Sequence, residues 1–201
     1  PWTSRISVFG LDSPNGYLND IIVQNNRIVP ADLSTGTPLS NGASAAGILV
    51  VGARNFTIAG NTVRRSLSDG IHITHSSRNG RIVNNTVTET GDDMIAVVSY
   101  LNTQWRTNAR SSSTWLTEHQ NRTLAQDILI ANNTVSDQYW GRGISVVGGK
   151  NVTIKNNDIT RSAMAAGILL SREEVPSTHG VNNVLVLNNT IRDIQTHAPS
   201  Y

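Results

Sequence analysis

Asparagine recurs before a β-branched residue at a regular interval, and this repeat constrains the fold more than any other feature of the chain. The aligned residues, Asn26, Asn61, Asn85, Asn133, Asn157 and Asn189, lie 35, 24, 48, 24 and 32 residues apart. The base interval is therefore 24 residues, with extra residues in three places. Self-similarity at a period of about 20–50 residues indicates a repeat architecture.

Apolar residues follow the same register in three columns. The first column holds Ile48, Ile71, Ile95, Ile144 and Ile168. The second holds Ile58, Ile82, Ile130, Ile154 and Val186. The third holds Val63, Val87, Val135, Ile159 and Ile191. The residues around each column alternate in and out, as they do in a strand. Glycine precedes the first strand in most repeats, at Gly47, Gly70, Gly143 and Gly167, where we expect a tight bend.

Three short strands in a repeat of this length predict one coil of a parallel β-helix. The recurring Asn side chains would then stack along the axis and form hydrogen-bonded ladders. The alternative is a β-sandwich, whose strands also recur about every 8–12 residues. A sandwich has no reason to keep Asn and Ile in register, and no amphipathic helix is visible. We therefore expect an all-β solenoid of about six to seven coils in a single domain, residues 1–201.

Three insertions interrupt the repeat, at residues 30–45, at residues 172–182 and, the largest, at about residues 100–125. Long loops on a rigid repeat usually collect on the binding face. We expect the largest loop to leave the coil and to border the site. Its Trp105 and Trp115 would stack on sugar rings or, in the alternative, pack the loop onto the solenoid.

Composition excludes several classes of protein. The 201 residues are 38% hydrophobic and 15% charged, which suits one domain with a long, thin core. A net charge of +2 without a basic stripe argues against nucleic-acid binding. No apolar run approaches a membrane span. The chain has no Cys, which excludes disulfides and thiol catalysis. It begins at Pro1 without Met, so we expect a processed, trimmed or partial chain.

Two carboxylates lie side by side in Gly91-Asp92-Asp93-Met94, one repeat after Ser68-Asp69-Gly70. Parallel strands lie about 4.8 Å apart. Stacking would therefore gather Asp69, Asp92 and Asp93 beside Arg142, provided that the largest insertion adds no coil. Like charges that close resist joint ionisation, so at least one pKa should rise. A turn-forming role before glycine explains Asp69 alone, but not the double Asp.

Other polar residues fall near this cluster in the predicted register. Outward positions on the same strands include Thr74 and Ser145, and His75 and Arg172 share the next corner. We expect Arg142 to hold Asp93 as the anion and to leave Asp92 free to keep a proton near neutral pH. The candidate substrate-binding residues are Arg142, His72, His75, Lys150, Arg172, Trp105, Trp115 and Trp140.

Four segments resemble, in order and approximate spacing, the active-site segments of the polygalacturonase-like glycoside hydrolases, which have the pectin lyase fold. They are Asp69-Gly70-Ile71, Gly91-Asp92-Asp93-Met94-Ile95-Ala96-Val97, Gly141-Arg142-Gly143-Ile144-Ser145 and Gly167-Ile168-Leu169-Leu170-Ser171. The family's own segments run Asn-Thr-Asp-Gly, Gly/Gln-Asp-Asp-Cys-Ile-Ala, Gly-His-Gly and Arg-Ile-Lys. The resemblance covers roughly residues 67–172, and the Asp-Asp segment is its most specific part.

This resemblance implies a right-handed parallel β-helix and an inverting hydrolase. Asp92 would be the general acid, and Asp69 and Asp93 would activate the attacking water. The chain departs from the family where Arg142 replaces His and Met94 replaces Cys. Leu169-Leu170-Ser171 also replaces the Arg-Ile-Lys whose two cations grip a uronate, and only Arg172 lies close. Family members are longer, so the chain would be the middle of such an enzyme or a short relative.

Three functions of different classes remain open. The first is an inverting glycoside hydrolase that acts on a polysaccharide or oligosaccharide and needs no cofactor. The second is a polysaccharide lyase or uronate epimerase, in which Asp69, Asp92 and Asp93 would bind Ca²⁺ while Arg142, Lys150 or a His handles the proton. The third is a non-catalytic surface or adhesin β-helix. For each we expect an extracellular or secreted protein, and we expect a monomer that binds neither nucleic acid nor membrane.

Overall fold

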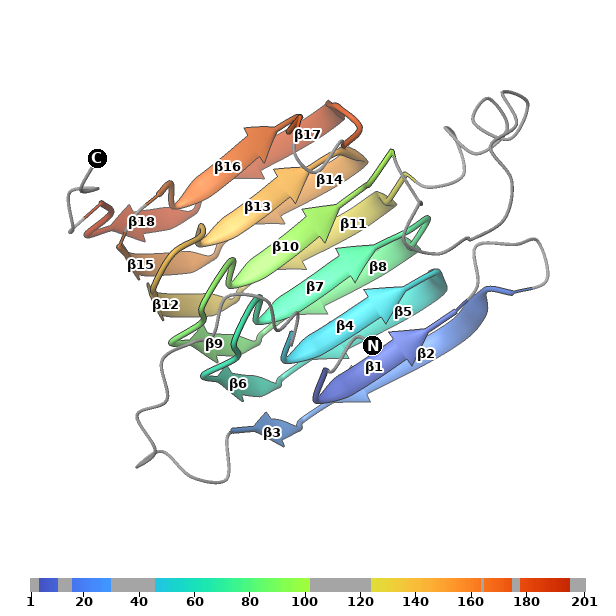
Figure 1. Cartoon of the computed structure of the whole chain (residues 1–201), viewed down its shortest axis with the longest axis horizontal. Coiled ribbons are helices and arrows are strands. Elements are labelled where there is room, and N and C mark those ends of the chain that lie inside the picture. The colour runs from blue at the N-terminus through green and yellow to red at the C-terminus, as the bar shows by residue number, and fades with distance from the viewer. Residues whose placement is uncertain are drawn as a thin grey trace.

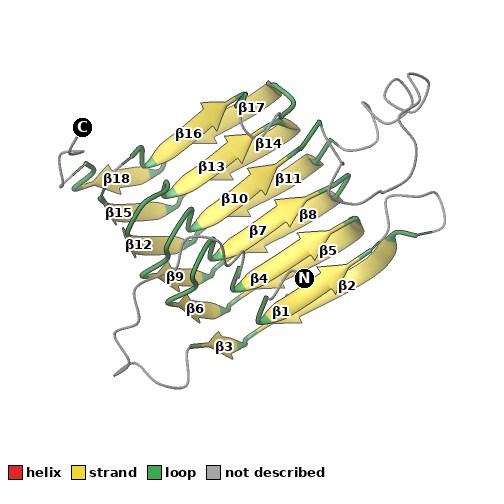
Figure 2. Cartoon of the chain, viewed as in Figure 1, coloured by secondary structure: helices red, strands yellow, loops and turns green. Residues whose placement is uncertain are grey.

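The computed structural model describes residues 4–10, 16–29, 46–101, 124–163, 165–174 and 178–195. These residues form a stack of six coils, and each coil contributes one strand to each of three parallel sheets. Figures 1 and 2 show the sheets running along the stack, with the strands of successive coils side by side. The described part of the chain contains no helix, so none is present there that could cross a membrane. The prediction of a parallel β-helix is confirmed, and the sandwich alternative is wrong.

The strands follow one another in the order first, second and third sheet in every coil. The first sheet contains β1 (Ile6–Phe9), β4 (Ile48–Val51), β7 (Ile71–Thr74), β10 (Ile95–Val98), β13 (Ile144–Val147) and β16 (Ile168–Ser171). The second contains β2 (Leu18–Gln24), β5 (Ala53–Ala59), β8 (Arg78–Val83), β11 (Gln126–Ala131), β14 (Gly149–Lys155) and β17 (Val181–Leu187). The third contains β3 (Arg27–Ile28), β6 (Thr62–Arg64), β9 (Thr86–Thr88), β12 (Thr134–Gln138), β15 (Asp158–Ser162) and β18 (Thr190–Arg192).

The apolar columns fill the inside of the coils in the predicted register. Ile48, Ile71 and Ile95 pair in sequence along the first sheet, and Ile144 and Ile168 continue the row. The equivalent rows of the second and third sheets are also in register. Between the end coils these side chains are fully buried and form one continuous core. Burial of the β-branched columns therefore holds the three sheets together.

The repeated asparagines stabilise the corner between the second and third sheets. The side chain of Asn133 donates to Asn157 Oδ1 (2.9 Å) and to the carbonyl of Ile82, and its own Oδ1 accepts from Asn85. The residue before each ladder Asn adopts a left-handed conformation, as at Asn132 (φ 56°), and Gly60 (φ 62°) does so before Asn61. Asn tolerates this region better than most residues. The Asn-Asn pairs therefore combine a left-handed corner residue with a ladder residue.

The glycines before the first sheet lie at bends, and close packing leaves no room there for a side chain. A Cβ on Gly70 would lie 2.2 Å from the Val87 side chain and 2.5 Å from the carbonyl oxygen of Met94. A Cβ on Gly143 would likewise lie 2.5 Å from the carbonyl oxygen of Gly167 and 2.5 Å from the Ile159 side chain. Neither glycine has a positive φ. The chain bends at these glycines, as expected, but the bend uses no left-handed conformation. These positions lack a side chain because the third sheet packs directly on the backbone.

The insertions agree with the prediction in part. The segment at residues 100–125 adds no coil, because β10 pairs directly with β13. Residues 102–123, with Trp105 and Trp115, lie outside the described residues, as do residues 30–45. The loop predicted at residues 172–182 ends earlier, because β17 already begins at Val181.

Candidate active site

The predicted acidic cluster forms where three successive strands of the first sheet begin. The amide of Gly47 donates to the carbonyl of Asp69, that of Gly70 to Asp93, and that of Met94 to Arg142, at 2.9–3.0 Å. These bonds stack Asp69, Asp93 and Arg142 in neighbouring coils. Asp92 lies beside them, because its amide donates to the carbonyl of Ser68 (3.1 Å). The register of the repeat, together with the direct β10–β13 pairing, therefore brings the predicted residues together.

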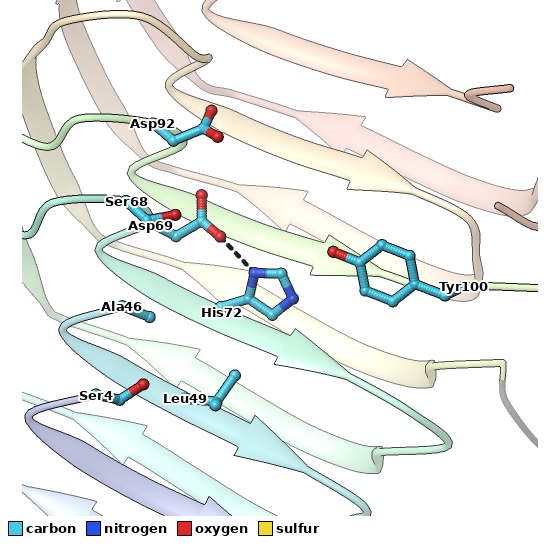
Figure 3. A pocket seen from close by; sticks show the side chains of 8 residues that line it. All are labelled: Ser4, Ala46, Leu49, Ser68, Asp69, His72, Asp92 and Tyr100. Atoms are coloured by element: carbon cyan, nitrogen blue, oxygen red, sulfur yellow. Dashed lines mark hydrogen bonds and ion pairs between the residues drawn. The ribbon is translucent and has the colours of Figure 1, made fainter. Parts of the chain in front are cut away.

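The three carboxylates face one another closely. Each offers an oxygen within 4.8 Å of an oxygen of the other two. Asp69 and Asp93 are buried, whereas Asp92 is partly exposed. Figure 3 shows the side chains of Asp69 and Asp92 rising from adjacent coils toward the same space. Asp92 is therefore the more accessible member of this close pair.

Donors surround Asp93 on both oxygens. Its Oδ1 accepts from the backbone amide of Arg142 (2.7 Å) and pairs with Arg142 Nε (3.2 Å). Its Oδ2 accepts from the hydroxyl of Ser145 on β13. Ser145 is fully buried, at an outward position of the first sheet that the sequence had indicated. These contacts fix the orientation of the Asp93 carboxylate.

Asp69 pairs with His72, which lies in the same coil on β7. Nδ1 of His72 contacts Oδ2 of Asp69, as the dashed line in Figure 3 marks. The His72 ring stacks on Tyr100 with 6.4 Å between centroids and 9° between planes. Burial by itself lowers the pKa of His72, but Asp69 and the other two carboxylates outweigh burial and raise it. His72 is therefore poised to carry a positive charge beside Asp69.

Burial and mutual repulsion perturb the carboxylates. Burial raises the pKa of Asp92, the charge of Asp69 adds to this, and Arg142 opposes it. The same causes raise the pKa of Asp93 to about 7. Arg142 favours the Asp93 anion, as expected, but burial and the charge of Asp69 outweigh the guanidinium in the pKa of this group. The cluster as a whole retains a proton near neutral pH, and such interacting groups titrate as a unit.

A pocket of about 200 Å³ opens over Asp69 and Asp92. Its lining consists of Ser4, Ala46, Leu49, Ser68, Asp69, His72, Asp92 and Tyr100, all drawn in Figure 3. Burial and the nearby carboxylates raise the pKa of Tyr100, so its phenol stays protonated. A ligand in this pocket would thus meet carboxylates on one wall and apolar or hydroxyl groups on the others.

Tyr100 lines the pocket and Glu173 pairs with Arg142, although neither was among the predicted site residues. Tyr100 forms an antiparallel bridge with Thr178, and the amide of His179 donates to the carbonyl of Ser99 (2.8 Å). Glu173 accepts from the Arg142 guanidinium at 2.7 Å. Both residues lie in insertions, where the repeat register no longer predicts position. Their place in insertions that were expected on the binding face was the available signal.

The remaining candidate residues lie in different places. His75 is fully buried, and its ring centroid lies 5.7 Å from that of Tyr100, which lines the pocket. Lys150 is exposed on β14 of the second sheet, away from the sheet that carries the cluster. Arg172 is exposed beside Glu173. Trp140, 64% exposed, precedes Gly141 at the cluster, and Tyr139 beside it is 66% exposed.

The same carboxylates have the spacing of a divalent-cation site. Calcium–oxygen distances of about 2.3–2.6 Å allow ligand oxygens nearly 5 Å apart, and the three Asp oxygens satisfy that limit. However, His72 and Arg142 already pair with Asp69 and Asp93. These two cationic side chains contact the carboxylates directly and would compete with a metal ion for the same oxygens. The donor set therefore fits a cation in spacing, but not in charge environment.

Comparison with known proteins identifies the architecture. A family model described as a right handed beta helix region matches residues 46–199. This description agrees with the three parallel sheets and supplies the right-handed sense that the sequence predicted. No curated protein and no solved structure matches the chain.

Proposed function

The chain belongs to the right-handed β-helix region family, and on this premise we propose that it is a carbohydrate-active enzyme that hydrolyses glycosidic bonds. The fold is shared by glycoside hydrolases, lyases and adhesins, so the proposal rests on the site. The observation that carries it is the set of three carboxylates within 4.8 Å of one another. Two of them have a raised pKa. Glycoside hydrolysis requires a protonated and an ionised carboxyl group together.

Asp92 is the general acid in this proposal. It lines the pocket and is partly exposed, whereas Asp93 is buried and absent from the lining. A group that protonates a glycosidic oxygen must come within hydrogen-bond reach of it. Burial and Asp69 raise the pKa of Asp92, which favours the acid form. Asp92, the accessible member of the cluster, then delivers the retained proton to the glycosidic oxygen.

Asp69 and Asp93 hold and activate the water. Two oxygens within 4.8 Å can share one water through hydrogen bonds of ordinary length. His72 orients Asp69, and Ser145 and Arg142 orient Asp93. Trp140, with Tyr139, offers an exposed aromatic surface for sugar rings next to Gly141. Such rings give apolar contact area to a sugar face.

The proposed stereochemical outcome is inversion, as the resemblance implied, because the water held by Asp69 and Asp93 attacks directly. Inverting pairs have carboxyl groups about 6.5–9.5 Å apart and retaining pairs about 5–5.5 Å apart. The 4.8 Å limit for Asp69 and Asp92 joins single oxygens and not the two carboxyl groups. Proton NMR of the first anomer released distinguishes the two directly.

Substitution of Asp92 tests the proposal on a panel of polysaccharides, with release of new reducing ends as the measurement. We expect Asp92→Asn to lower the rate by about 10²–10⁴-fold, because an amide cannot donate the proton. Asp69→Asn and Asp93→Asn should each lower it strongly. Asp127→Asn, on the exposed face of β11, is the matched control and should change nothing. Rates within a few-fold of the parent for all three site variants would exclude these residues from catalysis.

The cation-compatible spacing supports a lyase as the second candidate. Under that alternative EDTA abolishes activity, Ca²⁺ restores it, and the products carry an unsaturated, ultraviolet-absorbing end. Under the hydrolase proposal EDTA has no effect, and the products absorb no more than the substrate. A single assay with and without chelator therefore separates the two candidates.

A further inference from the structure

Resting on the proposed function, we propose that Glu173 sets the substrate class: it pairs with Arg142 and so reserves the site for neutral glycans, excluding uronates. The inference concerns specificity and assigns Glu173 no part in bond cleavage.

Arg142 lies between two carboxylates. Its Nε is 3.2 Å from Asp93 Oδ1, and one terminal nitrogen is 2.7 Å from Glu173 Oε1. The Arg142 side chain is 20% exposed and that of Glu173 is 30% exposed, so water screens this pair only in part. A guanidinium binds carboxylates through its fork of N–H donors. Two of the three guanidinium nitrogens therefore already face protein carboxylates, and Glu173 offsets the positive charge that a sugar carboxylate would otherwise pair with.

The backbone holds Glu173 in place to make this pair. Its amide donates to the Thr178 hydroxyl (2.9 Å), and the amide of Thr178 donates to the Glu173 carbonyl (3.0 Å). Thr178 in turn bridges to Tyr100, which lines the pocket. Glu173 also adds to the negative charge that raises the pKa of Tyr100. These bonds tie the backbone of Glu173 to Thr178, and through Thr178 to Tyr100 in the pocket lining.

The charges around the pocket repel an anionic sugar. Asp69, Asp92, Asp93 and Glu173 face Arg142 and His72, and His72 is already paired with Asp69. The other lining residues are uncharged: Ser4, Ala46, Leu49, Ser68 and Tyr100. Lys150 is exposed on another sheet. Among the described residues that line the pocket, a uronate carboxylate would therefore meet like charges and find no uncommitted cation, whereas sugar hydroxyls can donate to the carboxylates.

Matched glycans test the inference. Uronate-containing polysaccharides and their carboxyl-reduced forms differ only in one carboxylate per uronate residue. We expect the wild-type chain to turn over or bind the reduced form at least about tenfold better, as like-charge contacts oppose the acidic form. Glu173→Gln keeps the shape of the side chain but releases Arg142, so it should shift this preference toward the acidic form by about tenfold. Glu174→Gln, at the exposed neighbouring position, should leave the preference unchanged.

Each outcome decides between the alternatives. Equal or better use of the acidic form by the wild-type chain would overturn the inference while leaving glycoside hydrolysis intact. An unchanged preference in a folded Glu173→Gln protein, with circular dichroism as the check, would overturn the role of Glu173. Failure to turn over or bind any glycan would overturn the proposed function, and the inference with it.

Discussion

At the scale of single residues, the site depends on a missing side chain as much as on those present. A Cβ on Gly141 would lie 2.2 Å from Asp92 Oδ1, 2.5 Å from Asp93 Oδ1 and 2.6 Å from the Asp93 amide nitrogen. The backbone before Arg142 therefore passes directly against both carboxylates. This close approach explains why glycine stands between the exposed Trp140 and the buried part of the cluster.

Gly141→Ala should consequently displace Asp92 and Asp93 and lower kcat by about 10²-fold, since misplacement of a catalytic group by about 1 Å has that effect. Gly180→Ala is the matched control, because a Cβ at Gly180 meets nothing within 4 Å. Steady-state kinetics on the best substrate of the panel provide the measurement. Equal kcat for the two variants would show that catalysis does not depend on the close contact between the Gly141 backbone and the two carboxylates.

At the scale of the strand and its corner, one buried asparagine in each inner coil connects neighbouring coils among the described residues. Asn133 is 1% exposed, and every polar atom of its side chain is bonded within the ladder or to the carbonyl of Ile82. Asn26, at the first position of the same ladder, is exposed. The contribution of a ladder asparagine to the free energy of unfolding should therefore depend on its place in the stack.

Asn133→Ala should lower the free energy of unfolding by about 3 kcal/mol, because it leaves buried partners on Asn85, Asn157 and Ile82 without their bonds. Asn26→Ala should lower it by less than about 1 kcal/mol, since water replaces its bonds. Urea unfolding of the two variants measures the difference. Equal losses would mean that the interior of the ladder contributes no more than its end.

The sequence predicted those parts of the structure that recur in every coil. Ile95 and Asn133 could be placed because each repeat puts the same residue type in the same environment. The Asp cluster followed, since a fixed register determines which residues stack. Tyr100 and Glu173 could not be placed, because insertions do not share the register. The raised pKa of Asp93 also escaped prediction, because it depends on burial that a register does not reveal.

At the scale of the whole molecule, the site opposes stability at neutral pH. The pKa of Asp93 is 3.8 in its ordinary state and about 7 in the fold, so the folded chain keeps a proton that the unfolded chain loses between these values. A group with a raised pKa gives stability that is complete below the unfolded value and is lost as pH rises through the folded value. The raised pKa of His72 acts in the same direction, above its ordinary 6.5.

The free energy of unfolding should therefore fall as pH rises from about 4 to about 7, by an amount on the order of a few kcal/mol. Asp93→Asn removes the titrating group and should flatten this slope and raise stability at neutral pH. Asp127→Asn, at an exposed site, should retain the slope. Urea unfolding across this pH range provides the measurement, and a slope that survives Asp93→Asn would assign it to other groups.

The most direct test of glycoside hydrolysis by the acidic cluster follows the oxygen of water. The glycan panel is incubated with the chain in water enriched in oxygen-18, and mass spectrometry locates the label, with preformed products in the same water as the control for spontaneous exchange. We expect heavy oxygen at the newly released anomeric carbon, and none above the control with Asp92→Asn. Unlabelled products with unsaturated ends, or equal labelling by Asp92→Asn, would contradict this expectation.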